Sequence, residues 1–161
     1  MATAVQGSGV WSGLSKSIAE TIEAVQDSIV TVRGGGRSTS SGVVWRPGVI
    51  VTVRQGLRRS DSLQAAQHGD PFPATLVGAD AGTDLAVLRV DNSIGKPAEA
   101  IGSQPTRVGE VVLAVGRSAL GDISASAGII ARLGSSWRIR HRATCTSQDW
   151  RCWLETLGWR C

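Results

Sequence analysis

The sequence predicts an all-β fold preceded by one short helix. Apolar residues alternate with a period of two in about eight short runs, and turns rich in glycine and proline separate these runs. The composition agrees, because the chain has 20 glycines, a single phenylalanine and no tyrosine, and valine and isoleucine dominate its middle. A chain of 161 residues is long enough to form one domain with a buried core. Short strands at this spacing are typical of a barrel or a sandwich.

The first element is a helix predicted over residues 12–26. Its apolar residues recur at spacings of three and four and therefore share one face: Leu14, Ile18, Ile22 and Val25. Ser12 is the expected N-cap, because its hydroxyl can accept a hydrogen bond from the first turn. We expect this face to pack on an edge of the β fold. A membrane-surface helix would need a long, strongly charged opposite face, which this segment lacks.

The strands follow in order, joined by turns with the expected residues. The predicted strands are 28–33, 42–45, 49–53, 62–66, 74–77, 84–90, 110–115 and 124–133. Arg46-Pro47-Gly48 and His68-Gly69-Asp70-Pro71 are predicted turns. The stretch Gly34-Gly35-Gly36 could cradle a phosphate with its backbone N–H groups, but it matches no known phosphate-binding pattern and is interpreted as a loop.

The residues after Gly134 differ sharply in composition from those before. Residues 135–161 contain all three cysteines, four of the six tryptophans and most of the basic excess behind the net charge of +4. They have no period-two run, so we interpret 135–161 as an irregular tail. Four potential zinc ligands lie there, Cys145, Cys152, Cys161 and His141, but without the closely spaced cysteine pair that usually nucleates a zinc site.

The same tail raises the hypothesis of nucleic-acid binding. Its arginines alternate with Trp137, Trp150, Trp153 and Trp159, which could contact phosphates and stack on bases. No known module organises these residues, and the tail's excess of positive charge is small. We therefore expect neither nucleic acid nor a bound metal, and no cofactor.

Four segments of the β region resemble the HtrA-type, trypsin-like serine proteases. They are Ser41–Trp45 with Gly48–Thr52, Thr83–Leu88, Val108–Gly116 and Ser126–Ile130. They occur in the family's order, and the resemblance covers about 28–136. It implies a chymotrypsin-like first barrel and an incomplete second one. The expected domains are an arm and helix at 1–27, the first β-barrel at 28–107, a partial second barrel at 108–134 and the tail at 135–161.

The resemblance also indicates where a catalytic triad would lie. Asp84 stands at the position of the family's catalytic acid, and Gln55 stands where the family has its histidine. A glutamine amide cannot take a proton at neutral pH, so it cannot act as a general base. His68 is interpreted as a solvated turn histidine, and His141 in the tail offers no better base. With no histidine to orient, Asp84 is expected to cap a turn through its own side chain.

A nucleophilic serine is not found. The family's serine lies in a G-x-S-G loop, whose backbone N–H groups also form the oxyanion hole. No such motif follows Leu133. Neither Ser8 nor Ser118 lies in a complete G-x-S-G pattern, since Gln6 stands where the first glycine would precede Ser8 and Ala119 follows Ser118. We therefore expect a truncated, catalytically inactive serine protease homologue. One alternative is a pseudoprotease that binds peptide or protein segments, and a further one is nucleic-acid or zinc binding by the tail.

The N-terminal residues and the number of cysteines predict where in the cell the protein is located. Residues 1–12 lack the basic and apolar stretches of a signal peptide, so a cytoplasmic location is expected, although members of the family are often periplasmic or extracytoplasmic. No run of about 18 apolar residues predicts a membrane span. An odd number of cysteines without an export signal indicates reduced thiols.

Overall fold

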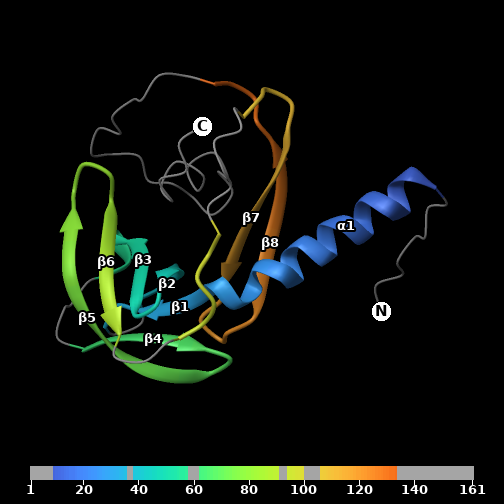
Figure 1. The fold of residues 1–161 in the computed structure, drawn as a ribbon. Helices are drawn as coiled ribbons and strands as arrows, with labels where there is room; N and C mark the ends of the chain where they lie inside the picture. The colour runs from blue at the N-terminus through green and yellow to red at the C-terminus, as the bar shows by residue number, and fades with distance from the viewer. Residues whose placement is uncertain (1–8, 36–37, 58–61, 91–93, 100–105, 134–161) are drawn as a thin grey trace.

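A computed structural model describes residues 9–35, 38–57, 62–90, 94–99 and 106–133. Within the described residues, a helix, short 3-10 helices and strands follow one another in sequence order (Figure 1). They are α1 (Val10–Val25), η1 (Gln26–Ser28), β1 (Ile29–Arg33), β2 (Thr39–Arg46), β3 (Val49–Val53), η2 (Arg54–Gly56), β4 (Leu63–Gln67), β5 (Asp70–Asp80), β6 (Leu85–Val90), β7 (Val111–Arg117) and β8 (Ile123–Ile129). The all-β fold with one short N-terminal helix is confirmed.

Six strands form a closed antiparallel barrel in the order β1-β2-β3-β6-β5-β4, and β4 pairs back onto β1. The register shifts once between β2 and β3, at Trp45, and once between β5 and β6, at Val77. Bulges of this kind bend a strand and increase its twist, which closing a small sheet into a barrel requires. The predicted first barrel is therefore present.

The core fills the inside of this barrel. Every strand of the barrel supplies inward residues: Val30, Val32, Val44, Ile50, Leu63, Ala65, Leu88 and Val90, joined by Ile94 and by the half-buried Phe72, Ala74 and Leu76. Gly42 allows the closest approach, since a Cβ there would lie 2.8 Å from methyl groups of Val32 and of Ile50. A side chain at this position would displace the packed interior.

β7 and β8 form a separate two-stranded antiparallel sheet beside the barrel (Figure 1). Within the described residues these two strands are all that represents a second barrel. Arg117, at the end of β7, joins this sheet to the rest of the fold. It is only 7% exposed, and its guanidinium donates to the backbone oxygens of Ile29 (2.8 Å), Gln26 (2.8 Å) and Gly121 (2.7 Å).

The helix differs from its prediction in its start and in its packing. α1 begins after Gly9, which has no side-chain hydrogen bond to the helix, so the prediction that Ser12 is the N-cap is wrong. No residue of α1 is buried, and the helix projects away from the barrel (Figure 1). The expected packing on a barrel edge is therefore wrong, and Trp11 and Leu14 remain exposed at 74% and 40%. None of the helices in the described ranges is long and apolar enough to span a membrane.

Among the strands, β5 departs most from the sequence prediction. It begins at Asp70, although a turn was predicted through Pro71 and a strand only from Ala74. Pro71 and Pro73 lie opposite β4, in the part of β5 that precedes its pairing with β6. A strand with one neighbour tolerates proline, because the missing N–H faces away from the ladder. β8 likewise ends at Ile129, earlier than the predicted Leu133.

Candidate functional site

The pairing of β3 with β6 brings Gln55 and Asp84 together. Val53, the last residue of β3, lies opposite Leu85, the first residue of β6. η2 continues directly from β3, and Asp84 directly precedes β6. The backbone N–H of Arg54 donates to the carbonyl of Asp84 at 2.7 Å and so extends the ladder by one bond. The two positions that the sequence marked as family base and family acid are therefore neighbours.

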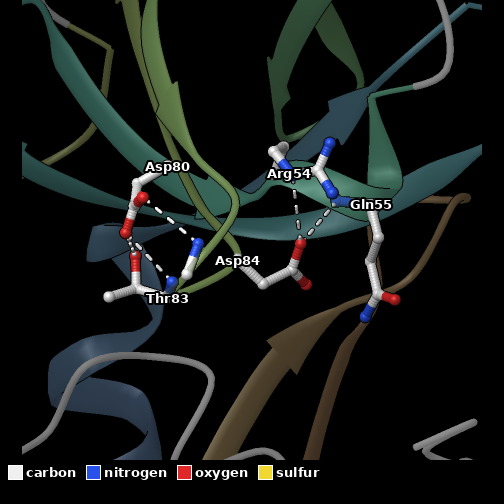
Figure 2. A network of polar contacts seen from close by, with 6 residues as sticks. Arg54, Gln55, Asp80, Thr83 and Asp84 are labelled. Atoms are coloured by element: carbon white, nitrogen blue, oxygen red, sulfur yellow. Dashed lines mark hydrogen bonds and ion pairs between the residues drawn. The ribbon is translucent and has the colours of Figure 1, made fainter. Parts of the chain in front are cut away.

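The Asp84 carboxylate points at η2. Its Oδ1 accepts a hydrogen bond from the backbone N–H of Gln55 at 3.1 Å and lies 3.8 Å from Nε of Arg54 (Figure 2). The side chain of Asp84 is 26% exposed, so this ion pair is partly screened by water. The side-chain amide of Gln55 extends away from this carboxylate (Figure 2). The contact to Gln55 is therefore made through the backbone and not through the glutamine side chain.

Asp84 also has an unusual backbone conformation. Its φ of 57° lies in the left-handed region, which asparagine and aspartate tolerate better than other residues with a Cβ. Asp84 was expected to cap a turn through its side chain. Its carboxylate does accept an N–H of a turn, but that turn is η2, since the donor Gln55 lies 29 positions earlier in the chain. This conformation turns the side chain from the β5–β6 connection toward η2.

Asp80 caps the turn between β5 and β6. Its carboxylate accepts hydrogen bonds from the hydroxyl of Thr83 (2.7 Å), the N–H of Thr83 (3.0 Å) and the N–H of Gly82 (3.1 Å) (Figure 2). These bonds, first of all the one from the Thr83 hydroxyl, hold the pKa of Asp80 below its ordinary value. Sequence reasoning missed this residue, although an aspartate before a glycine and a threonine is a recognisable turn pattern.

Hydroxyl groups of Ser38, of β2 and of β3 form hydrogen bonds near η2. Ser38 donates to the carbonyl of Gly56 at 2.8 Å, and Thr52 donates to the carbonyl of Ser41 at 2.8 Å. The hydroxyls of Ser40 and Thr52 lie 3.1 Å apart, and Thr52 is fully buried. Of these hydrogen bonds, the one from Ser38 reaches η2 itself and ties the short helix that carries Gln55 to the residue before β2. The other two join β2 to β3.

The remaining sequence candidates do not join this pair. His68 lies in the turn between β4 and β5 with φ of 51°, and its Nε2 is 3.7 Å from Asp27 at the surface. Ser118 accepts hydrogen bonds from the N–H groups of Leu120 and Asp122, both at 3.2 Å, within the β7–β8 turn. His141, Ser8 and the three cysteines lie outside the described residues. Across the described ranges, no cluster of three histidine, cysteine, aspartate or glutamate side chains could hold a metal ion.

The site pairs the Asp84 carboxylate, a hydrogen-bond acceptor, with a residue at position 55 that cannot transfer a proton. A carboxylate held by a backbone N–H and an arginine is well suited to orient an adjacent base. The residue beside it, however, carries an amide. An amide neither takes nor delivers a proton at neutral pH, so the pair Gln55–Asp84 cannot activate a nucleophile in the way that a histidine–aspartate pair does.

Comparison with known proteins identifies the family. The family model described as a trypsin-like peptidase domain matches residues 40–156 and so extends past Gly134 into the tryptophan-rich segment. The chain is 40% identical over 83 residues to the serine endoprotease DegS of Salmonella typhimurium, covering 50% of this chain and 23% of that protein. It is 39% identical over 98 residues to DegS of Haemophilus influenzae, covering 58% and 28%.

A solved structure has the same architecture. The serine endoprotease from Yersinia pestis superposes with a TM-score of 0.65 at 28% identity, over 72% of this chain and 44% of that one. This chain thus corresponds to about a quarter of the length of the curated DegS proteins and to under half of the solved protease. From the family match over most of its length, together with the barrel and its neighbouring sheet, the chain belongs to the trypsin-like peptidase domain family, among relatives of the HtrA type.

Proposed function

We propose that this chain is a catalytically inactive member of the trypsin-like family. The observation that supports the proposal is the residue at position 55. The Asp84 carboxylate reaches the backbone of Gln55 at 3.1 Å, so the acid and the residue at the base position are adjacent, yet the side chain offered there is an amide. General-base activation of a serine requires a group that gains a proton near neutral pH, and an amide does not.

The sequence around the site supports the same conclusion. His68, the single histidine among the described residues, has a side chain 64% exposed and belongs to a surface turn with Asp27 as its neighbour. The pattern G-x-S-G, which would supply a nucleophile and an oxyanion hole, occurs nowhere in the printed sequence. Two of the three catalytic functions of the family therefore have no residue assigned to them here.

A pseudoprotease that binds peptide or protein segments is the second candidate. The observation in its favour is the closed first barrel with its core of valine, isoleucine and leucine. This barrel is formed with glutamine, not histidine, at position 55. Folding of the barrel does not depend on a catalytic histidine. A barrel that no longer catalyses cleavage can therefore still bind a peptide or protein segment. A saturable interaction of the intact chain with a peptide or protein partner would support this function.

Labelling with a serine-directed fluorophosphonate tests the main proposal. We expect no labelled band from the purified full chain, and hydrolysis of peptide esters no faster than in buffer. A trypsin-like protease of known activity, treated in parallel, is the positive control. A labelled serine would contradict the proposal, and mass spectrometry of the labelled peptide would identify the residue.

A further inference from the structure

The outer edge of β8 is unpaired by any other described strand. β8 pairs with β7 on one side, and the sheet has no third strand in the described part of the chain. On the β7 side, the N–H of Ile130 donates to Glu110 at 2.9 Å and the N–H of Ser118 donates to Asp122 at 2.8 Å. Backbone groups of an antiparallel strand alternate between its two neighbours. The residues that direct N–H and C=O to the open edge are therefore Ile123, Ala125, Ala127 and Ile129.

The strand β8 itself lacks the charges, proline and bulges that usually prevent pairing with another chain. The strand Ile123–Ile129 contains no charged residue and no proline, and its register with β7 is free of bulges. Native edge strands are normally blocked by such features. One face of the sheet is also apolar and solvent-exposed, with Val111 at 58% and its cross-strand neighbour Ile129 at 52% exposure.

The strand is complementary to itself when it is reversed. With Ser126 at the centre, an antiparallel copy places Ile123 opposite Ile129 and Ala125 opposite Ala127. These are the residues whose backbone groups face the open edge, so the register fulfils the hydrogen-bonding pattern of an antiparallel ladder. Ser124 then lies opposite Gly128. The isoleucines and alanines of both copies therefore lie on one face of the joined sheet, and the serines and glycines lie on the other.

The charges that flank the strand are complementary in the same register. Asp122 lies opposite Ile130 of the copy, and Arg132 of the copy is its diagonal neighbour. Both side chains are exposed, and the twofold axis repeats the contact at the other end. Diagonal positions lie within reach of long side chains, so opposite charges there favour this register over its neighbours.

We propose that two copies of this chain associate through their β8 edges. The strands pair antiparallel about a twofold axis at Ser126, and the two hairpins become one four-stranded sheet with a continuous apolar face. The second copy is the occupant because the strand's register, side-chain sizes and flanking charges all match their own reverse. This association is independent of whether the chain cleaves peptides.

Substitutions at Ser126 test the pairing, because this residue faces its own counterpart. Ser126 is exposed in the single chain, so a longer side chain there is compatible with the hairpin. In the pair, Ser126→Lys would place two ammonium groups on adjacent residues across the axis, where like charges destabilise. We expect sedimentation velocity of the full chain to show a dimer at micromolar concentrations. Ser126→Lys should weaken it about tenfold or more.

Two further variants separate charge from size and folding. Ser126→Gln adds length without charge and is expected to leave the dimer intact. Ser126→Glu alone is expected to be monomeric, whereas an equimolar mixture with Ser126→Lys should restore dimers through opposite charges. Circular dichroism of every variant confirms that each is folded.

Three outcomes would overturn the proposal. One is a wild-type chain that sediments as a monomer throughout, including the case in which the edge amides of Ala125 and Ala127 are protected by residues of the same chain. The second is a Ser126→Lys dimer as tight as that of Ser126→Gln. The third is a mixture of the lysine and glutamate variants that stays monomeric.

Discussion

The Asp84 carboxylate accepts its hydrogen bond from the backbone N–H of Gln55, at 3.1 Å and across 29 residues of sequence. Because the donor is a backbone group, the contact does not depend on which side chain stands at position 55. A change of the side chain at position 55 is therefore expected to leave the fold around the acid unchanged. The backbone fixes where the Asp84 carboxylate lies relative to position 55, whereas the side chain at position 55 decides whether the site can transfer a proton.

Gln55→His is expected to fold and to build a histidine–aspartate pair. Gln55 is exposed and the carboxylate is already in place, so the new imidazole needs no rearrangement of the backbone. An adjacent carboxylate favours the protonated imidazole, so the histidine pKa should be higher than in the double variant Gln55→His/Asp84→Asn. Titration of the imidazole signals by NMR measures both values. Equal values would show that Asp84 does not face the side chain at position 55.

The same single variant is expected to gain no hydrolytic activity. Members of a triad act as a unit, so a new histidine alone should not restore turnover where the printed sequence has no G-x-S-G pattern. Hydrolysis of an activated peptide ester, followed over a day, is the measurement. Turnover that disappears on adding Asp84→Asn would reveal a serine nucleophile that the sequence pattern does not identify.

Sequence reasoning predicted the elements that bring the site together. The run Val49–Val53 is β3 as predicted, and the Asp84–Val90 run is β6 with one residue fewer, since both are short β-branched segments between clear turns. Gln55 and Asp84 are neighbours because these two strands pair with each other, which the sequence did not predict. The family resemblance only placed Gln55 and Asp84 at two positions of one catalytic triad.

The features that sequence reasoning missed depend on contacts between distant residues. β5 begins four residues earlier than predicted, because Phe72 packs against the core and Pro71 and Pro73 lie where only β4 is a neighbour. α1 was expected to pack on the barrel, since its apolar face is regular, but amphipathicity does not specify a partner. Arg117 donates to three backbone carbonyls, and two of them, on Gln26 and Ile29, belong to residues 91 and 88 positions earlier in the chain, so no local pattern predicts the contact.

Asp84→Ala is expected to destabilise the chain by roughly 1–2 kcal/mol, and Asp84→Asn by less. Alanine removes the acceptor for the Gln55 N–H and also places a residue that avoids positive φ at a φ of 57°. Asparagine keeps an acceptor oxygen and tolerates the left-handed conformation. Urea denaturation of the three chains measures the difference. Equal destabilisation by alanine and asparagine would indicate that the charge near Arg54 matters more than the backbone contact.

Asp80→Asn is expected to make stability less dependent on pH in the acid range. Hydrogen bonds from Thr83 and Gly82 lower the pKa of Asp80 in the folded chain. A lowered folded pKa contributes stability that is fully present above the unfolded value of about 3.9 and is lost as the pH falls through the folded pKa. The stability difference between wild type and Asp80→Asn should therefore be largest near neutral pH and should shrink below pH about 4. A difference that is constant with pH would contradict this account.

The buried Arg117 is expected to be the most sensitive link between the β7–β8 sheet and the first barrel. Its guanidinium serves three backbone carbonyls, on Gln26, Ile29 and Gly121, and no carboxylate among the described residues forms an ion pair with it. The carbonyl of Gln26 lies at the C-terminal end of α1, where a cation is favourable, and that of Ile29 directly follows η1. Removing the donor leaves partly buried oxygens without a partner, which costs more than the net value of the bonds themselves.

Arg117→Met should therefore lower the free energy of unfolding by about 3 kcal/mol, and Arg117→Lys by about 1–2 kcal/mol, because one ammonium cannot serve three separated carbonyls. Arg107→Met is the matched control, since Arg107 pairs with Glu110 at the surface with 82% of its side chain exposed and should change stability by about 0.5 kcal/mol or less. Hydrogen exchange localises the effect. Amides of β7 and β8 should lose protection in Arg117→Met while those of β3 and β6, deep in the barrel, keep theirs, because the arginine joins the two sheets and contributes nothing to the core of the first.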